Sequence, residues 1–183
     1  MFIQRKIHQR KNESMKIYIT GFMGSGKTTF GKEIAELIGY EFIDLDKEVE
    51  KIEDSTIPQI FKDKGEDAFR EAEYKALMAT AKAENAVVAT GGGTPCYFDN
   101  MRWMNDNGIT IYLKLFEGEL KKRLEPDMNS RPLLNGIDAD DLERFVYNTL
   151  RERAYYYHQA KIVIDPLSIP ADELVNILRQ DYI

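Results

Sequence analysis

The sequence predicts an α/β fold in which helices cover a parallel β-sheet, and three observations support this prediction. Segments with the apolar patterns of strands and helices alternate along the chain, which is the order that builds a parallel sheet. The segment 86–90 is apolar up to its final Thr90, as expected for a strand that is buried on both faces. A glycine-rich loop over residues 21–28 lies between the first predicted strand and the first predicted helix.

Composition and charge limit the classes of function. The 183 residues, 43% hydrophobic and 31% charged, suit one ordinary globular domain. The formal net charge of -6 argues against a general affinity for nucleic acids, and no apolar run approaches the roughly 20 residues that span a bilayer. The single cysteine, Cys96, excludes an internal disulfide. We therefore expect a cytoplasmic protein, monomeric by default, with no nucleic-acid or membrane partner.

The first fourteen residues differ from the rest of the chain. They carry Arg5, Lys6, Arg10 and Lys11 against Glu13, and no apolar core follows these charges as it would in a signal peptide. We expect residues 1–14 to be a basic, loosely ordered extension, with a targeting or partner-binding arm as the alternative. A single domain is expected over 15–183.

The first half of the domain is predicted to begin with a strand, a helix and a second strand. Apolar residues recur on one face of the helix from Thr28 to Ile38, and Gly39 supplies its stop. Pro58 fits the first turn of a further helix, where a missing N–H costs nothing. The predicted elements are a strand over 16–20, a helix over 28–38, a strand over 42–43 and mostly helical structure over 47–84, interrupted near 55–58 and at Gly65.

The second half continues the alternation of strands and helices. The segment 125–136 contains Pro126, Asn129, Pro132 and Gly136, which are typical of a loop. The predicted elements are a strand over 86–90, a helix over 100–107, a strand over 109–114, a helix over 117–124, the loop over 125–136, a helix over 139–158, a strand over 161–164 and a helix from Pro170.

The loop over 21–28 matches the pattern G-x-x-x-x-G-K-[ST], which binds phosphate. Glycines let the backbone point several N–H groups inward, and the following helix presents its positive end to the same phosphates. In this pattern Lys27 reaches the β- and γ-phosphates, and the Thr28 hydroxyl ligates Mg²⁺. The position between a strand and a helix is the one that this motif requires, so the sequence predicts nucleoside triphosphate binding.

Acidic residues and glycines follow two other predicted strands. Asp44 and Asp46 come after the second strand, where one acid can help to hold Mg²⁺ and the other can accept a hydrogen bond or a proton from a substrate hydroxyl. A helix N-cap with a dipole-favoured acid is the alternative. Gly91–Gly93 follow the strand over 86–90 and permit close approach by a ligand, unless they form only a flexible turn.

Four cations are candidates for an anion pocket. Lys27 belongs to the phosphate loop, and Arg70 lies one helical turn before Glu73, whose carboxylate can orient the guanidinium; this spacing is also common on protein surfaces. Arg131 lies in the predicted loop, from which it can reach a transferring phosphoryl group, although an arginine there is often merely solvated. Arg153 is the fourth candidate.

These motifs together resemble the shikimate kinases over nearly all of residues 15–180. The resemblance rests on their joint order and spacing. The matching segments are Gly21-Phe22-Met23-Gly24-Ser25-Gly26-Lys27-Thr28-Thr29, Phe42-Ile43-Asp44-Leu45-Asp46, Ile57-Pro58-Gln59-Ile60-Phe61, Gly65-Glu66 through Phe69-Arg70, Ala89-Thr90-Gly91-Gly92-Gly93, Arg131-Pro132-Leu133-Leu134, and Arg151-Glu152-Arg153 ahead of Tyr157.

The resemblance implies a three-layer α/β/α P-loop kinase with a five-stranded parallel sheet in the order 2-3-1-4-5. It implies transfer of the γ-phosphate of ATP to the 3-hydroxyl of shikimate, with Mg²⁺, in aromatic amino-acid synthesis. The segment 125–136 would then be a lid over the site.

The resemblance also implies roles for individual residues. Lys27, Asp46 and Arg131 would be catalytic. Thr28 and Asp44 would hold the metal. The acceptor would be bound by Asp46, Arg70, Gly91, Gly92, Gly93 and Arg153, and ATP by Gly24, Ser25, Gly26, Lys27, Thr28, Thr29, Arg123 and Arg131.

Two features depart from the pattern of the family. The segment 125–130 lacks the basic residues expected of the lid, and the late loop over 165–170 has no arginine. The contact of Arg123 with adenine is therefore open. Two other functions also stay open at this point: a gluconate-type or other small-metabolite kinase, and an ATP-sensing interaction module that does not transfer the phosphoryl group.

Overall fold

The computed structural model describes residues 14–183, except for the side chains of residues 129 and 130. The predicted extension over 1–14 therefore lies outside the described residues, apart from Ser14. The strands are β1 (Lys16–Thr20), β2 (Glu41–Asp44), β3 (Ala86–Ala89), β4 (Ile109–Leu113) and β5 (Ile162–Ile164). The helices are α1 (Lys27–Ile38), α2 (Leu45–Glu53), α3 (Ile57–Ala79), α4 (Asn100–Asn107), α5 (Glu117–Leu124), α6 (Leu142–Tyr157) and α7 (Ala171–Asp181). Short 3₁₀ helices are η1 (Thr80–Lys82), η2 (Thr94–Cys96), η3 (Glu125–Ser130) and η4 (Pro132–Leu134).

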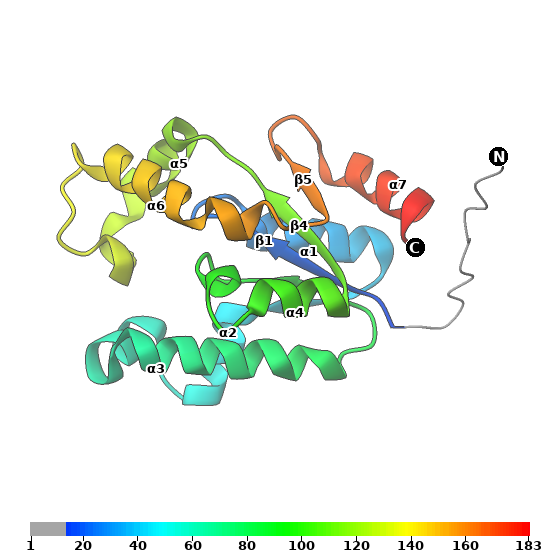
Figure 1. The fold of residues 1–183 in the computed structure, drawn as a ribbon, viewed down its shortest axis with the longest axis horizontal. Helices are drawn as coiled ribbons and strands as arrows, with labels where there is room; N and C mark the ends of the chain where they lie inside the picture. Colours follow the sequence, from blue (N-terminus) through cyan, green and yellow to red (C-terminus); the bar gives the residue numbers. More distant parts are fainter. Residues whose placement is uncertain (1–13) are drawn as a thin grey trace.

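The strands form one parallel sheet in the order β2-β3-β1-β4-β5, as the family resemblance implied (Figure 1). Within β1, Ile17 is paired with Val87 of β3 on one side and with Ile109 of β4 on the other. The helices that follow β1 and β3 pack on opposite faces of the sheet. A crevice therefore opens beyond the carboxyl ends of these two strands, and ligands bind at such positions in open α/β sheets.

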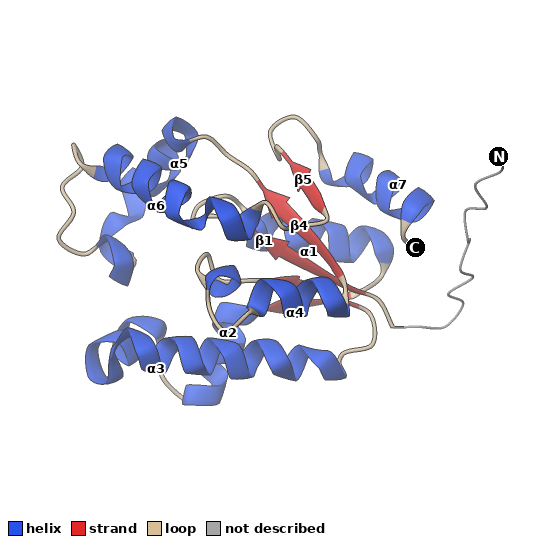
Figure 2. Ribbon diagram, in the orientation of Figure 1, coloured by secondary structure: helices blue, strands red, loops and turns tan. Residues whose placement is uncertain are grey.

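Alternate residues of β1 face opposite layers of helices. Ile17 and Ile19 join a buried cluster with residues of α1 and α7, whereas Tyr18 joins a second cluster with residues of α2, α3 and α4. This alternation follows from the period of a strand. Figure 2 shows the sheet between the two groups of helices. The three-layer α/β/α prediction is confirmed.

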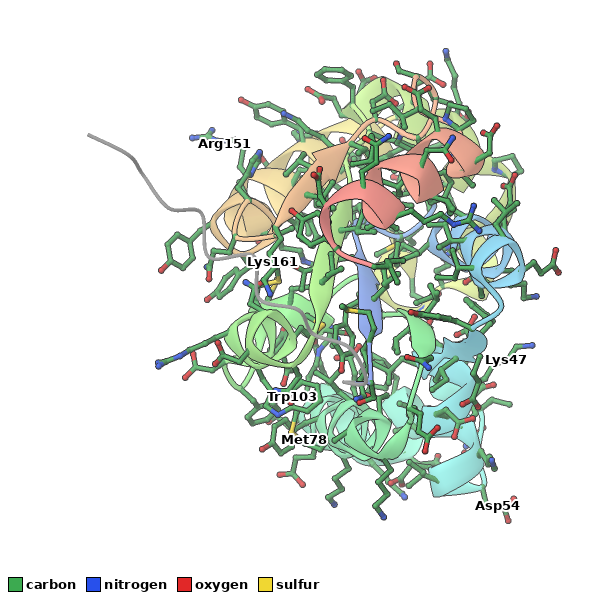
Figure 3. All side chains as sticks on the ribbon, turned by 90° about the vertical axis from the view of Figure 1, so that its right-hand side faces the viewer. Lys47, Asp54, Met78, Trp103, Arg151 and Lys161 are labelled. Carbon is green, nitrogen blue, oxygen red and sulfur yellow. The ribbon has the colours of Figure 1, made fainter. Side chains whose placement is uncertain are left out.

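The second cluster extends toward the surface between α3 and α4. Met78 of α3 and Trp103 of α4 are partly buried and pack against it, and both are labelled in Figure 3. The Trp103 ring meets the ring of Tyr18 edge-on, with centroids 5.9 Å apart, an arrangement that aromatic pairs prefer. Trp103 therefore packs α4 against the end of this cluster.

A third cluster lies beside the phosphate loop. Buried residues of α5, α6 and η4 pack there against Phe22 of the loop. The segment 125–136, predicted to be a loop, instead contains η3 and η4. Its prolines, Pro126 and Pro132, occupy the first turns of these short helices, where a residue without an N–H is tolerated.

The remaining differences concern the ends of elements. Helical structure was predicted to begin at residue 47, which placed Asp46 in the connection after the strand. In the structure α2 begins at Leu45, directly after β2, so Asp46 lies in the first turn of the helix. α6 begins at Leu142 instead of 139. The predicted break at Gly65 is confirmed: this residue has φ 81° inside α3, a value that suits glycine. Among the described residues, no helix is long and apolar enough to cross a membrane.

Candidate functional site

The phosphate loop connects β1 to α1 at the crevice. Gly21, Gly24 and Gly26 have φ values of 144°, 77° and 93°. Residues that have a Cβ atom rarely adopt such positive φ values. Ser25 is fully buried beneath the loop, and its N–H donates to the carbonyl oxygen of Phe22 at 3.1 Å. The loop is therefore a closed turn that leads into the N-terminus of α1.

Lys27 folds back onto this loop. Its Nζ donates hydrogen bonds to the carbonyl oxygens of Gly21 at 2.9 Å and of Phe22 at 2.8 Å. Burial lowers the pKa of Lys27 to about 8, against the attraction of the nearby Asp46 carboxylate. A neighbouring anion favours the protonated form of an amine. Lys27 would therefore bind a polyphosphate placed here more tightly than it binds the two carbonyl oxygens that now accept its hydrogen bonds.

Thr28 and Asp44 lie together at the entrance to the loop. The Thr28 hydroxyl donates to Oδ2 of Asp44 at 3.0 Å, so two oxygen ligands of the kind that Mg²⁺ prefers are within reach of one ion. Among the described residues, no group of three or more His, Cys, Asp or Glu could hold a metal. Mg²⁺ is usually held by one or two protein ligands together with substrate phosphates and water. The two residues therefore fit the predicted metal.

These residues line a cavity of about 300 Å³ over the phosphate loop. Its lining includes most of the predicted nucleotide-binding residues and both predicted metal ligands; Ser25 is not part of it. The lining residues are Met23, Gly24, Gly26, Lys27, Thr28, Thr29, Asp44, Asp46, Thr90, Gly92, Arg123 and Arg131.

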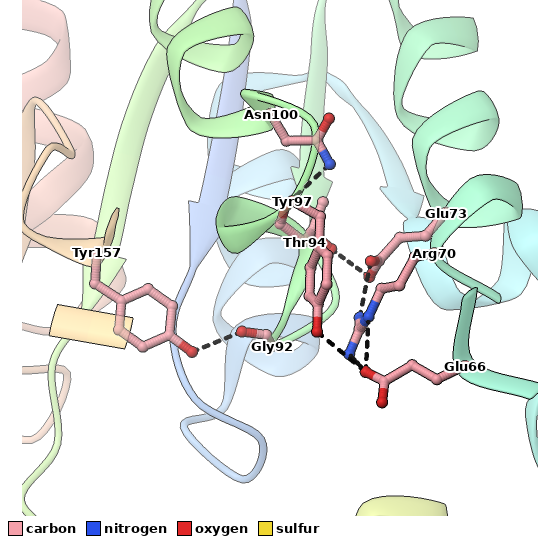
Figure 4. Close-up of polar contacts among 8 residues, drawn as sticks. All are labelled: Glu66, Arg70, Glu73, Gly92, Thr94, Tyr97, Asn100 and Tyr157. Atoms are coloured by element: carbon pink, nitrogen blue, oxygen red, sulfur yellow. Dashed lines mark hydrogen bonds and ion pairs between the residues drawn. The ribbon is translucent and has the colours of Figure 1, made fainter. Parts of the chain in front are cut away.

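Arg70 is enclosed by two carboxylates of its own helix (Figure 4). Its Nη1 donates to Oε2 of Glu73 at 2.9 Å, and its Nε and Nη2 donate to Oε1 of Glu66 at 3.2 and 2.9 Å. The Tyr97 ring lies against the guanidinium, with its centroid 4.4 Å from Cζ. Glu73 is fixed in turn, because its Oε1 accepts a 2.5 Å hydrogen bond from the buried Thr94 hydroxyl. The predicted orienting pair of Arg70 and Glu73 is therefore present.

At two positions of the run Gly91–Gly93, protein side chains leave no room for a Cβ. A Cβ on Gly91 would collide with Oε1 of Glu73, and one on Gly93 would lie 2.6 Å from Nη1 of Arg70. Both close contacts involve protein side chains; the close approach of a ligand to this run stays a prediction, and all three glycines line a cavity described below. None of the three glycines has a left-handed φ, so their backbone conformation by itself does not require glycine. The run thus lets α3 bring Arg70 and Glu73 against the end of β3.

Asp46 faces the same end of β3 from α2. Asp46 is an exposed residue that lines both cavities. Partial desolvation by the walls of these cavities, followed in size by repulsion from Glu73, raises the pKa of Asp46 to about 6, and Lys27 opposes the shift. A carboxyl group with such a pKa is ionised near neutral pH and basic enough to accept a proton.

Two further predicted arginines have buried N–H groups without partners. Nε of Arg131 and Nη1 of Arg153 make no hydrogen bond within the described part of the chain. Arg131 also forms an ion pair with Asp127, with Nη2 and Oδ2 3.3 Å apart. Unsatisfied buried donors are uncommon, and cations that carry them at a cavity are suited to binding an anion.

A second cavity, of about 350 Å³, lies beside the first. It is lined by the predicted acceptor-binding residues, by apolar groups and by two further acids. The lining residues are Met23, Asp46, Glu50, Ile57, Pro58, Phe61, Phe69, Arg70, Glu73, Gly91, Gly92, Gly93, Arg131, Pro132, Leu133 and Arg153. The two cavities share Met23, Asp46, Gly92 and Arg131, so a group bound over the phosphate loop and a group bound beside Arg70 would meet at these residues.

The structure adds residues that sequence reasoning missed. Glu66 and Tyr97 contact Arg70, and Thr94 holds Glu73. Tyr157 donates a 2.6 Å hydrogen bond to the carbonyl oxygen of Gly92, which ties α6 to the glycine run. The contact of Glu66 with Arg70 could have been predicted from their i, i+4 spacing on a helix. Contacts between distant segments, such as that of Tyr157 with Gly92, leave no signal in the local sequence.

The structure also places Arg123, Cys96 and the consecutive tyrosines over 155–157. Nη1 of Arg123 donates to the carbonyl oxygen of Gly24 at 3.3 Å, at the rim of the nucleotide cavity. Burial raises the pKa of the Cys96 thiol to about 11, which disfavours the thiolate, the reactive form of cysteine. Tyr157 is buried in the core, whereas Tyr155 is 75% exposed.

The comparisons with known proteins agree with this geometry. The family model described as shikimate kinase matches residues 23–181. A shikimate kinase from Parabacteroides distasonis is 45% identical over 150 residues, covering 82% of this chain and 87% of that protein.

Two solved structures are also similar to this chain. A shikimate kinase from Bacteroides thetaiotaomicron is 38% identical with a TM-score of 0.81, covering 91% of this chain and 97% of its own. A shikimate kinase from Acinetobacter baumannii, solved in complex with shikimate, is 34% identical with a TM-score of 0.81, covering 91% of this chain and 92% of its own. With the family model, these similarities lead to one conclusion: the chain belongs to the shikimate kinase family.

Proposed function

We propose that this chain transfers the γ-phosphoryl group of ATP to the 3-hydroxyl of shikimate, in the presence of Mg²⁺. The observation that carries the proposal is the pair of adjoining cavities that meet at Asp46 and Arg131. One cavity is built from a phosphate-binding loop, and the other combines arginines with apolar side chains. Donor and acceptor bound in this way are brought together, and positioning is the larger part of catalysis in phosphoryl transfer.

The acceptor cavity has the chemistry of a ring that bears a carboxylate and hydroxyl groups. Arg70 and Arg153 bind the carboxylate, helped by the N–H of Gly92, because planar guanidinium groups pair with carboxylates through two parallel hydrogen bonds. Phe61 and Phe69, whose ring centroids are 4.8 Å apart, pack against the carbon ring. Gly91 and Gly93 lack a Cβ and so leave room for the side chains of Glu73 and Arg70, which line this cavity.

Asp46 holds the reacting hydroxyl. With a pKa raised to about 6, it is ionised at neutral pH and accepts the hydroxyl hydrogen bond. It takes the proton as the phosphoryl group transfers, or shortly afterwards, because a loose transition state needs little base catalysis. Asp46 is therefore the hydroxyl-binding acid in this proposal.

The donor cavity binds the triphosphate through the loop and its cations. Gly24, Gly26 and Thr29 line it, Lys27 binds the β- and γ-phosphates, and Arg131 contacts the transferring group. Thr28 and Asp44 would hold Mg²⁺, directly or through water, and the ion would neutralise charge on the phosphates. Arg123 lies at the rim, where it can contact the adenine.

The segment 125–136 acts as a lid in this account. It carries Arg131 into both cavities, and when closed it excludes water, which would otherwise compete with the hydroxyl for the phosphoryl group. In the cell, we propose a cytoplasmic monomer that contributes to aromatic amino-acid synthesis. The molar mass of the purified chain, measured by light scattering, tests the proposal that it is a monomer.

The rival functions differ at the acceptor side. A gluconate-type kinase has no need for two arginines around the carboxylate of a ring, and an ATP-sensing module has no need for an acid at the junction of two cavities. ADP release measured with ATP, Mg²⁺ and either shikimate, gluconate or no acceptor separates the three. The proposal expects release that depends on shikimate; equal release without any acceptor would refute it.

A further inference from the structure

Arg153, which the proposed function assigns to the acceptor carboxylate, has a guanidinium that is only partly paired. Its Cζ lies 5.7 Å from the centre of the Phe22 ring in the phosphate loop. Its Nη1 is buried and makes no hydrogen bond within the described part of the chain, and the residue lines the acceptor cavity. An arginine side chain has several rotatable bonds and loses much freedom when it is ordered. Some further contact must therefore fix the direction in which this guanidinium points.

The hydroxyl of Tyr157 supplies such a contact. Tyr157 follows Arg153 by one turn of α6, so the two side chains share a face of the helix. Tyr157 is fully buried, and its hydroxyl donates its single proton to the carbonyl oxygen of Gly92 at 2.6 Å (Figure 4). Burial raises the pKa of Tyr157, and Arg153 opposes this shift through its charge and a side-chain hydrogen bond. In that bond the guanidinium donates and the hydroxyl oxygen accepts, so one hydroxyl joins Arg153 to Gly92.

Gly92 gives the hydroxyl a fixed anchor. A Cβ on Gly92 would lie 3.1 Å from the backbone nitrogen of Met23 and 3.5 Å from the carbonyl oxygen of Gly21, so the glycine packs closely against the phosphate loop. The Tyr157 ring is also held, because it stacks on Tyr112 with centroids 4.8 Å apart. The hydroxyl is therefore fixed from both sides, by its own ring and by the end of β3.

We propose that Tyr157 is a positioning residue: its hydroxyl, anchored on Gly92, holds the Arg153 guanidinium so that its unpaired Nη1 faces the acceptor carboxylate. This inference rests on the proposed function and adds a residue that acts on the acceptor indirectly. Tyr157 is not one of the described residues that line the two cavities, so its effect passes through Arg153. A guanidinium that is already held in the binding orientation loses less conformational freedom when the carboxylate arrives, which strengthens binding.

Steady-state kinetics of Tyr157→Phe test the proposal, because this variant loses the hydroxyl and keeps the stacked ring. Its kcat/KM for shikimate should fall by roughly three- to tenfold, the range expected for one hydrogen bond. The fall should come from a higher KM, with kcat and the KM for ATP close to those of the wild type, since a carboxylate remote from the reacting hydroxyl is bound equally in the ground and transition states. Tyr155→Phe is the matched control on the same helix, because Tyr155 is 75% exposed; it should leave these constants unchanged.

The same substitution in an Arg153→Gln background shows whether Tyr157 acts through this arginine. Tyr157→Phe should change kcat/KM little there, because the group that it positions is gone. An unchanged kcat/KM in Tyr157→Phe alone would overturn the inference. An equal fall with and without Arg153 would also overturn it, because Tyr157 would then have only a structural role.

Shikimate methyl ester supplies a second measurement. An ester cannot form a charge-assisted pair with Arg153, so Tyr157→Phe should lower kcat/KM for the ester less than for the acid. The ratio of the two values does not depend on the concentration of folded enzyme, so it stays informative in a less stable variant; an unchanged ratio would contradict the proposal. An absence of shikimate-dependent ADP release in the wild type is a different result, and it would refute the proposed function and this inference with it.

Discussion

The carboxylates of Asp46 and Glu73 converge on one glycine, Gly91: an added Cβ there would collide with Oε1 of Glu73 and lie 3.1 Å from Oδ1 of Asp46. The two acids come from different helices, α2 and α3. Repulsion from Glu73 is the second cause, after burial, of the raised pKa of Asp46. The acid that positions Arg70 therefore also raises the pKa of Asp46, the acid that we propose to hold the reacting hydroxyl.

Asp46→Asn is expected to lower kcat by about 100-fold or more, within the range for loss of a general base or hydroxyl-orienting acid. ATP affinity, measured by calorimetry, should change far less, because the triphosphate is bound mainly by Lys27 and the loop. In the wild type, kcat/KM should fall as the pH drops through about 6, where Asp46 becomes protonated. Turnover close to that of the wild type would remove Asp46 from the mechanism.

The same substitution should stabilise the fold at alkaline pH. The pKa of Asp46 is about 6 in the native state against 3.8 for the free side chain, so the native state binds more protons than the unfolded state between these values. Stability therefore decreases as the pH rises through this window and stays lowered above it. Thermal unfolding should show a larger gain in Tm for Asp46→Asn at pH 8 than at pH 5. An equal gain at both pH values would contradict the shifted pKa.

Glu73→Gln tests the coupling between the two acids. Removing the charge should lower the pKa of Asp46, so the acid limb of the kcat/KM profile should move to lower pH. It should also lower Tm, because removing one partner of a buried ion pair is destabilising. An acid limb that stays in place, in a variant whose Tm has fallen, would show that Glu73 does not influence Asp46.

Gly93→Ala should weaken acceptor binding. The new methyl group would lie 2.6–2.8 Å from three atoms of the Arg70 guanidinium, and one of the two must move. We expect the KM for shikimate to rise at least tenfold, a change equal to about 1.4 kcal/mol. Gly118→Ala is the control, because nothing lies within 4 Å of its added Cβ, and alanine in helix α5 should be neutral or stabilising. Equal effects of both substitutions would refute this explanation of the glycine run.

Arg70→Lys keeps the charge but loses the planar fork. The KM for shikimate should rise by roughly tenfold or more, because an ammonium cannot form two parallel hydrogen bonds with a carboxylate, while the KM for ATP stays unchanged. Arg102→Lys supplies the matched control, since the Arg102 side chain is 81% exposed. Unchanged shikimate binding in Arg70→Lys would contradict the assigned carboxylate role.

ATP binding should be coupled to proton uptake at pH 8.5. The pKa of Lys27 is lowered to about 8 by burial, so a large fraction of Lys27 is neutral at this pH, and phosphates nearby would raise the pKa again. Calorimetric titration of Mg²⁺ and ATP in buffers with different ionisation enthalpies measures the number of protons taken up. Uptake should be smaller at pH 7, where Lys27 is already protonated. No uptake at pH 8.5 would show that Lys27 does not meet the phosphates.

Features that depend on local pattern could be predicted from the sequence. The phosphate loop, the helix stop at Gly39 and the break at Gly65 follow from the conformational freedom of glycine. The order of strands and helices follows from apolar periodicity, and the strand order came from the family resemblance. The boundaries of α2 and α6 were less accurate, because helix ends depend on tertiary contacts as well as on propensity.

The environment of Arg70 could be predicted only in part. Its pairing with Glu73 follows from helix geometry, since residues three apart share a face. The roles of Thr94, Tyr97 and Tyr157 depend on how η2 and α6 pack against α3 and the end of β3, which no local pattern encodes. The run Gly91–Gly93 was predicted to admit a ligand, and no local pattern showed that Gly91 and Gly93 also leave room for the side chains of Glu73 and Arg70.

Phosphorus-31 NMR of the reaction of the purified chain with ATP, Mg²⁺ and shikimate tests the central claim most directly. The account predicts one new phosphomonoester signal that is coupled to the proton at C3 of the ring and grows as the ATP signals are replaced by those of ADP. A signal coupled to a different ring proton, or release of inorganic phosphate alone, would contradict it.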